Sequence, residues 1–213
     1  MAPASPSPSA RWVAVVPVAI AIFVAFFWQL DHIGLVDETE PLFAEAARHM
    51  YATGDWITPY FNGATRFDKP PLVYWAMALG FHIFGVGELG VRLPSALAAA
   101  GLTGFGFYTL QRYGDISGHQ PPSRKQTFTL AAVVGAVAMA LHPETLVWGR
   151  TGVSDMLLSG CIGAALLCFF WGYAEGGKAR WYYGFYTFMA LGVLDKGPVG
   201  AVLPGLVVLL FAI

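Results

Sequence analysis

The chain has 213 residues, of which 56% are hydrophobic and only 12% are charged, and its mean hydropathy is +0.58. Soluble domains carry about 25% charged residues, so this composition indicates a protein that lies in a lipid bilayer. The formal net charge of −1 lacks the basic excess that nucleic-acid binding requires, so no nucleic-acid partner is expected.

The N-terminal part predicts a short tail followed by a membrane span. Residues 1–11 are rich in Pro, Ser and Ala, a composition typical of disorder. Residues 12–30 carry no charge, and at ~1.5 Å per residue they nearly cross a hydrocarbon layer of ~30 Å. A cleaved signal peptide is the alternative. The bulky end of the run lacks a small-residue cleavage site, which favours a retained first span.

Residues 31–92 form a long polar segment, which we expect to lie outside the membrane as a loop with interfacial helices. Its charged residues cannot enter hydrocarbon: they are Asp37, Glu38, Glu40, Glu45, Asp55 and Asp68, against Arg48, Arg66 and Lys69. Residues 40–53 read as a helix, with Asp37 or Thr39 as its cap and Gly54 as its end. Residues 70–87 are uncharged but rich in Pro and Gly, which indicates an interfacial or re-entrant helix.

The rest of the chain, residues 93–213, predicts a bundle of five further spans. The uncharged runs are 93–111, 126–143, 156–174, 181–194 and 197–213. The expected fold is therefore an all-α polytopic membrane protein with about six transmembrane helices. Short basic loops near Arg112, Arg124 and Lys125, and near Lys178 and Arg180, should face the cytoplasm. This puts the polar segment on the extracytoplasmic side of the plasma (inner) membrane.

This topology would gather charged residues from three turns on the outer face. Asp37 and Lys69 come from the polar segment. His142, Glu144, Arg150 and Asp155 follow the third span, and Asp195 and Lys196 follow the fifth. Charged groups at membrane level are costly and usually mark a functional site or pair with one another. Carboxylates beside cations suit transfer from a phosphate leaving group to a hydroxyl or amine, because the carboxylate takes the acceptor proton.

Each of these residues also has a purely structural explanation. Asp37, Glu38 and Asp155 could be helix caps or favour a helix dipole, and Lys69 could be a snorkelling lysine. Asp195 and Lys196 could neutralise each other. The histidines more often satisfy local hydrogen bonds than bind metal. Cys161 and Cys168 lie in an apolar run and are interpreted as small hydrophobic residues.

Short motifs in the polar segment resemble the first external loop of the GT-C membrane glycosyltransferases. They are Asp37-Glu38-Thr39, Ala44-Glu45, Gly54-Asp55-Trp56, Phe67-Asp68-Lys69-Pro70-Pro71-Leu72 and Tyr74-Trp75. The likeness is greatest to ArnT-like transferases of 4-amino-4-deoxy-L-arabinose and to dolichyl-phosphate-mannose protein mannosyltransferases. It continues through Gly90–Pro94, Ser154-Asp155 and the segment Gly192–Pro198, in matching order and spacing.

This resemblance implies a function and a role for individual residues. The donor would be a polyprenyl-phosphate sugar, transferred with inversion to a lipid, protein or glycan acceptor. Asp37 matches the acid proposed as general base, and Asp155 matches the second acid. Lys69 matches the lysine that contacts the donor phosphate, and Lys196 a lysine with a supporting electrostatic role. Glu38 and Arg150 are the remaining candidates for substrate or phosphate binding.

The chain departs from the family pattern at three points. About two extra residues separate Asp37-Glu38-Thr39 from Ala44-Glu45, and Asp195 stands where an uncharged residue is usual. Asp68 matches an acid linked to metal in some relatives, but the later partners of that acid are missing here, so a divalent metal is a weak possibility and no cofactor is assigned. The hydrophobic run still open at Ile213 also predicts a fragment of a longer protein. A transporter or channel-like subunit, and an inactive fragment, are the competing hypotheses.

Overall fold

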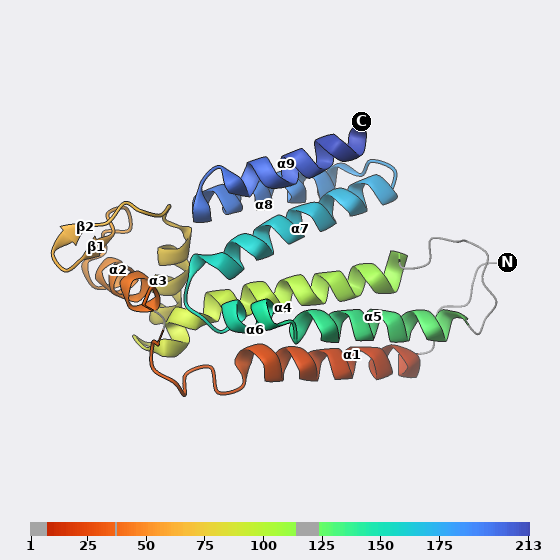
Figure 1. Ribbon diagram of the computed structural model, residues 1–213, viewed down its shortest axis with the longest axis horizontal. Coiled ribbons are helices and arrows are strands. Elements are labelled where there is room, and N and C mark those ends of the chain that lie inside the picture. Colours follow the sequence, from red (N-terminus) through yellow and green to blue (C-terminus); the bar gives the residue numbers. More distant parts are fainter. Residues whose placement is uncertain (1–7, 37, 114–123) are drawn as a thin grey trace.

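The computed structural model describes residues 8–36, 38–113 and 124–213, and most of them are helical. The long helices run side by side, and a smaller polar part caps one end of the bundle (Figure 1). The bundle contains α1 Pro8–Ile22, α4 Glu88–Tyr113, α5 Arg124–Ala140, α7 Ser154–Ala174, α8 Ala179–Lys196 and α9 Val199–Ala212. The expectation of an all-α fold is confirmed.

Two of these helices, α4 and α7, are by length and composition able to cross a membrane unaided, among the described residues. A third candidate is a broken span: residues 130–140 of α5 meet α6, Pro143–Gly149, at a bend of 58°. The predicted run 126–143 therefore ends early, because Pro143 begins the new helix α6 and disfavours a helical residue before it. Helix α9 and residues 13–27 are apolar but shorter.

The first helix changes its winding before it ends. Helix α1 passes into a π-helix, η1, at Phe23–Phe27, so the helical run stops short of residue 30. Arg150 holds this end, because its guanidinium donates to the backbone carbonyls of Ala25, Trp28 and Gln29 at 3.1, 2.8 and 3.2 Å. The last carbonyls of a helix have no hydrogen-bond donor within the helix. The Arg150 guanidinium supplies donors to them here.

The polar cap consists of helix α2, a small hairpin and helix α3. Helix α2 runs Glu40–Thr53, as predicted, and ends where Gly54 adopts a left-handed conformation at φ 75°. Strands β1 Tyr60–Phe61 and β2 Ala64–Thr65 pair antiparallel. Helix α3, Leu72–Phe84, lies across the end of the bundle (Figure 1). Phe43, Met50, Tyr74 and Met77 bury their side chains between α2 and α3.

Glycines allow two pairs of helices to approach closely. A Cβ on Gly80 of α3 would lie 2.6 Å from the carbonyl oxygen of Gly90 in α4. A Cβ on Gly200 of α9 would lie 2.1 Å from the carbonyl carbon of Gly192 in α8. Small residues at such crossings let helix backbones touch, which is common in membrane bundles. The α8–α9 pair therefore forms a tight hairpin around Gly197.

At the opposite end of the bundle, the turn between α7 and α8 gathers cations around one carboxylate. Glu175, whose side chain is only 7% exposed, pairs with Lys178 and Arg180 at 2.9 Å each and with Arg112 at 3.8 Å. Hydrogen bonds from Lys178, Trp181 and Arg180 outweigh burial and lower the pKa of Glu175 to about 2. The basic residues predicted to share one face therefore do share one end of the bundle. Arg124 and Lys125 begin α5.

Candidate functional site

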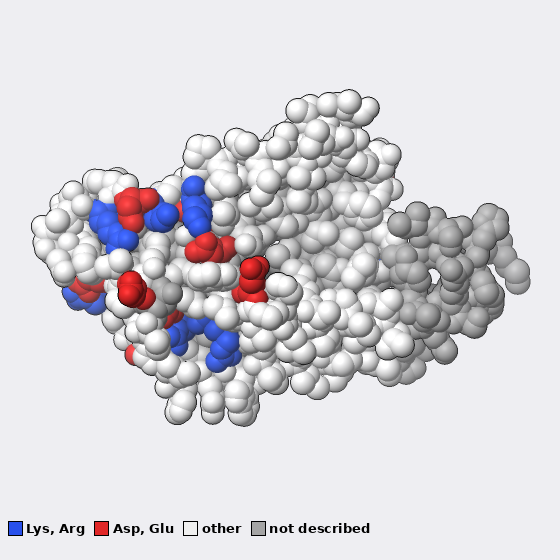
Figure 2. Space-filling view, in the orientation of Figure 1, with Lys and Arg blue, Asp and Glu red and all other residues white. Residues whose placement is uncertain are grey.

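Charged side chains gather at the polar end of the molecule, while the visible face of the helical bundle is almost free of them (Figure 2). This end is where the polar cap meets the starts of α4 and α7 and the end of α8 (Figure 1). Separate parts of the chain thus bring carboxylates and cations to one end, as the sequence predicted.

Asp155 and Lys196 form an ion pair at this end. The Lys196 Nζ donates to Asp155 Oδ1 at 2.5 Å, although the two residues lie on different helices. Asp155 is in the first turn of α7 and Lys196 in the last turn of α8, so the antiparallel packing of these helices sets the two side chains side by side. Both remain accessible, at 29% for Lys196 and 41% for Asp155. Lys196 therefore pairs with Asp155 rather than with its neighbour Asp195.

Asp195 lies next to this pair and is fully buried. Neither of its carboxylate oxygens has a hydrogen-bond partner within the described part of the chain. The Asp195 carboxyl nevertheless interacts electrostatically with the charges of Lys196, Asp155 and Lys69, so Lys69 belongs to the same group of charges. A buried carboxylate without hydrogen bonds is costly. The cluster of Asp155, Lys196, Asp195 and Lys69 is the candidate site, hereafter the charged cluster.

The turn before Lys69 is held by a network around Asp68. Arg66 Nη2 donates to Asp68 Oδ2 at 2.7 Å, and the Tyr74 hydroxyl donates to Asp68 Oδ1 at 3.2 Å. Burial alone would raise the pKa of Asp68, but the hydrogen bond and charge of Arg66 outweigh it, so the pKa lies below its ordinary value. Burial and the nearby Asp68 raise the pKa of Tyr74, which keeps its hydroxyl protonated as a donor. Asp68 therefore orients the turn that carries Lys69.

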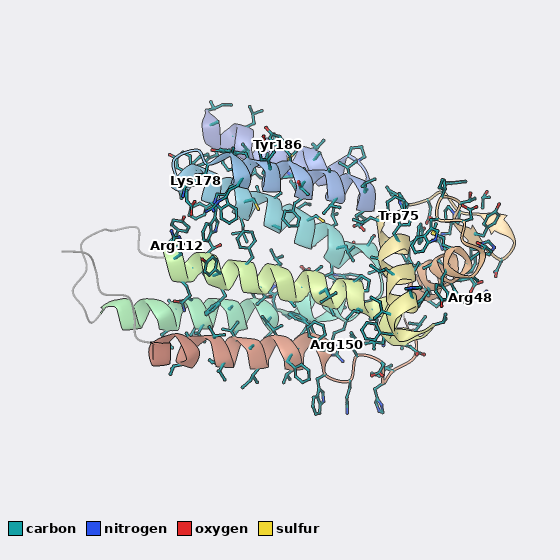
Figure 3. The ribbon with its side chains drawn as sticks, turned by 180° about the vertical axis from the view of Figure 1, so that it is seen from behind. Arg48, Trp75, Arg112, Arg150, Lys178 and Tyr186 are labelled. Atoms are coloured by element: carbon teal, nitrogen blue, oxygen red, sulfur yellow. The ribbon has the colours of Figure 1, made fainter. Side chains whose placement is uncertain are left out.

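A second hydrogen bond fixes the same turn from the other side. The indole nitrogen of Trp75, labelled in Figure 3, donates to the backbone carbonyl of Trp56 at 2.6 Å. This bond ties the first turn of α3 to the segment after α2. The Lys-Pro-Pro sequence at residues 69–71 is thus anchored on both flanks, which limits where the lysine can reach.

Sequence reasoning missed the buried pair of Arg92 and Glu40. Arg92 Nε and Nη2 donate to the two carboxylate oxygens of Glu40 at 3.0 and 3.1 Å, and both residues are buried. The Arg92 guanidinium also donates to the carbonyls of Leu30, Ile33 and Gly34. Glu40 Oε1 accepts from the backbone N–H of Gly152 at 2.6 Å. One ion pair thus joins the segment after η1 to α2, α4 and the segment that precedes α7.

Among the described residues, Glu38, Arg150, His142 and Glu144 form no hydrogen bond or ion pair with the charged cluster. Asp37 lies outside the described residues. Glu38 is exposed beside it in the sequence. Arg150 donates to the three carbonyls named above, and a contact with phosphate would have to replace those bonds. His142 and Glu144 are exposed at the start of α6.

The described residues do not fit a metal site. They contain no group of three or more His, Cys, Asp or Glu side chains placed to share an ion. Asp68, the residue considered for metal, already accepts hydrogen bonds at both oxygens. Cys161 and Cys168 are free and buried, as expected of small hydrophobic residues.

Comparison with known proteins gives consistent matches. Residues 68–116 match the family model of dolichyl-phosphate-mannose-protein mannosyltransferase. An undecaprenyl phosphate-alpha-4-amino-4-deoxy-L-arabinose arabinosyl transferase of Edwardsiella ictaluri is 33% identical over 178 residues, which is 79% of this chain and 30% of that protein.

Solved structures of ArnT from Cupriavidus metallidurans share the fold. The apo structure superposes with a TM-score of 0.82 and the complex with undecaprenyl phosphate with 0.81, each at 30% sequence identity. The apo comparison covers 97% of this chain and 36% of that one. The chain thus spans between 30 and 36% of the length of these relatives.

Proposed function

Because the chain belongs to the ArnT-like GT-C glycosyltransferases of the dolichyl-phosphate-mannose-protein mannosyltransferase family, we propose that it builds the catalytic outer face of a polyprenyl-phosphate sugar transferase. The observation that carries the proposal is the charged cluster at one end of the bundle. The relative in complex with undecaprenyl phosphate supports this donor class, since that protein binds the lipid phosphate.

Lys69 and Lys196 are proposed to receive the donor phosphate. Each ammonium offers three donors, so Lys196 can keep its bond to Asp155 while it contacts a phosphate oxygen. Asp155 then orients the Lys196 ammonium toward the phosphate, and its role is not limited to neutralising the charge of Lys196. Negative charge develops on the phosphate as its bond to the sugar breaks, and the two ammonium groups stabilise that charge. Electrostatic stabilisation contributes most where charge develops in this way.

Asp37 is proposed as the general base. An acceptor hydroxyl or amine gives its proton to the Asp37 carboxylate while its oxygen or nitrogen forms a bond to the anomeric carbon of the donor. The bond from that carbon to the phosphate oxygen breaks, and the electron pair leaves with the polyprenyl phosphate. Attack opposite to the leaving group inverts the configuration.

Glu38 and Arg150 are given supporting parts. Glu38 adjoins the base in sequence and is exposed, so it can contact the polar portion of a substrate. Arg150 fixes the end of the first helix, from which the segment bearing the base departs. We place the polar end on the extracytoplasmic side, because the cations around Glu175 at the other end match the cytoplasmic preference of Lys and Arg.

The test is the variant Asp37→Asn in the complete protein. Asn keeps the size of the side chain but cannot accept a proton, and general-base contributions are typically ~10²–10⁴-fold in rate. Sugar transfer should therefore fall by that factor, while membrane insertion and yield stay unchanged. Glu38→Gln, the adjacent exposed acid, is the matched control and should lose far less. If Asp37 serves only as a helix cap, Asn replaces it well and turnover survives.

A further inference from the structure

Three exposed cations meet at the end of the bundle that lies opposite the charged cluster. Arg112 is in the last turn of α4, Lys178 precedes α8 and Arg180 is in its first turn, and their side chains are 54%, 56% and 64% exposed. All three pair with Glu175, and these four residues are hereafter the basic cluster. Figure 3 labels Arg112 and Lys178 at this end. Because three cations meet one carboxylate, the described side chains of the cluster leave two positive charges unbalanced.

Glu175 holds the three cations together as one group. Lys178 Nζ and Arg180 Nη2 both lie 2.9 Å from the same carboxylate oxygen, Oε2, and Arg112 Nη2 lies 3.8 Å from Oε1. The indole N–H of Trp181 also donates to Oε2, at 3.1 Å, which fixes the carboxylate itself. An ammonium has three N–H donors and a guanidinium has five. One contact with Glu175 therefore leaves each of these exposed cations with further donors for an external anion.

Aromatic rings support the two arginines of the cluster. The Arg180 guanidinium lies 5.0 Å from the centroid of the Trp181 ring, and that of Arg112 lies 5.6 Å from the ring centroids of both Tyr113 and Trp171. The two tryptophan rings are themselves 4.7 Å apart, so both arginines rest on one aromatic group. Cation–π contacts of this kind favour one position of the guanidinium. Binding of an anion then costs less side-chain ordering than binding to freely rotating cations.

The basic cluster lies where membrane-crossing helices end. Helices α4 and α7, which are long and apolar enough to cross a membrane, end at Tyr113 and Ala174, directly beside residues of the cluster. Tyr108 and Tyr173, in the last two turns of these helices, are exposed. Tyrosine is enriched where hydrocarbon meets the lipid headgroups. The cations of the cluster are therefore at the level of the headgroup phosphates.

We propose that the basic cluster binds the phosphate of an anionic phospholipid. Charge complementarity selects this partner, because two unbalanced positive charges attract a headgroup with a net negative charge. A zwitterionic headgroup brings a cation of its own, which the cluster repels. Basic pockets between membrane helices recognise anionic headgroups in this way. The site lies at the other end of the bundle from the proposed transferase centre and does not depend on that function. A lipid bound here would link the end of α4 to the turn between α7 and α8.

Native mass spectrometry of the complete protein in detergent tests the site. The affinity for the first phosphatidylglycerol is compared with that for phosphatidylcholine with the same acyl chains, and the anionic lipid should bind at least about tenfold more tightly. Lys178→Gln and Arg180→Gln should each weaken phosphatidylglycerol binding about fivefold, the usual effect of one cation near an anionic surface, and leave phosphatidylcholine unchanged. Arg48→Gln removes a comparably exposed, carboxylate-paired arginine at the polar end and should change neither affinity.

Two further variants separate a lipid site from an internal ion pair. Glu175→Gln removes only the negative charge of the cluster, so phosphatidylglycerol binding should tighten. Unchanged or weaker binding would show that the cations serve Glu175 rather than a lipid. Arg180→Lys keeps the positive charge, so it should retain most of the affinity and a normal unfolding temperature. Loss of binding in Arg180→Lys equal to that in Arg180→Gln would show that charge is not what the lipid recognises.

The source of the phosphate is tested with glycerol 3-phosphate, the soluble counterpart of the lipid headgroup. It should bind at least about tenfold more weakly than phosphatidylglycerol, because it lacks the acyl chains that lie beside the helices. Equal affinity would overturn the assignment to a lipid in favour of a free phosphate. Equal binding of phosphatidylglycerol and phosphatidylcholine by the wild-type protein, or unchanged binding when Lys178→Gln and Arg180→Gln are combined, would overturn the site itself.

Discussion

Lys69 is the residue whose role depends most on its immediate setting. Its turn is anchored by Asp68 and Trp75, and its charge acts on the buried Asp195 carboxyl. A lysine that merely snorkels needs only an apolar stem and a positive tip, and it would not require an anchored turn. The network therefore favours contact with a ligand over simple exposure.

Substitution of Lys69 separates these roles. Lys69→Met should weaken binding of a polyprenyl-phosphate donor about ten- to hundredfold, since a charge-assisted hydrogen bond contributes roughly 1.5–3 kcal/mol. Lys69→Arg should restore part of that loss, because the wider guanidinium carries the charge in a different shape. The measurement is donor binding in nanodiscs, with the uncharged polyprenyl alcohol as the reference lipid. Equal losses for phosphate and alcohol would show that Lys69 does not recognise the phosphate.

At the scale of single elements, the α8–α9 hairpin places Lys196, because α8 ends at Gly197 and α9 turns back against it. Gly200→Ala would put a methyl group into the backbone of Gly192, where no side chain can yield. Overpacking of this kind costs typically about 1–3 kcal/mol. We expect Gly200→Ala to lower the thermal unfolding temperature and to weaken donor binding, since the end of α8 must shift.

Gly205→Ala is the matched control on the same helix. Its added methyl would meet only Met189 Cε, at 3.9 Å, an ordinary contact. Alanine also favours a helix interior over glycine by roughly 0.8–1.0 kcal/mol. The unfolding temperature should therefore stay or rise. Equal destabilisation by both variants, measured by thermal unfolding in detergent, would show that the Gly192–Gly200 contact has no special importance.

Local signals predicted several of these elements well. Helix α2 was predicted residue for residue, because its apolar stripe and Gly54 are both readable in the sequence. The break between α5 and α6 had a signal in Pro143 that the hydrophobic run obscured. The Arg92–Glu40 pair had none, since the partners are 52 positions apart and only the packing of α2 on α4 brings them together. The contact of Asp155 with Lys196 likewise required the antiparallel packing of α7 and α8.

At the scale of the whole molecule, the two ends of the bundle differ in charge arrangement. The polar end mixes carboxylates and cations in separate clusters. The other end holds Arg112, Lys178 and Arg180 around a single carboxylate, which leaves an excess of positive charge. Lys and Arg near the ends of spans favour the cytoplasmic side. We therefore propose one orientation for the whole chain, with the charged cluster outside.

Cysteine labelling of intact cells tests this orientation in a background without Cys161 and Cys168. Cysteines placed singly at Ala52, Glu144 and Pro198, which are exposed in three different parts of the polar end, should all react with an impermeant thiol reagent. A cysteine at Lys178, 56% exposed at the other end, should react only after the membrane is opened. Each of the three outer positions follows a helix that runs toward the polar end, and their common labelling requires that α3 stays at the interface. If α3 crossed the membrane, Ala52 and Glu144 would label from opposite sides, and the residues proposed as general base and as phosphate ligands could not share one reaction.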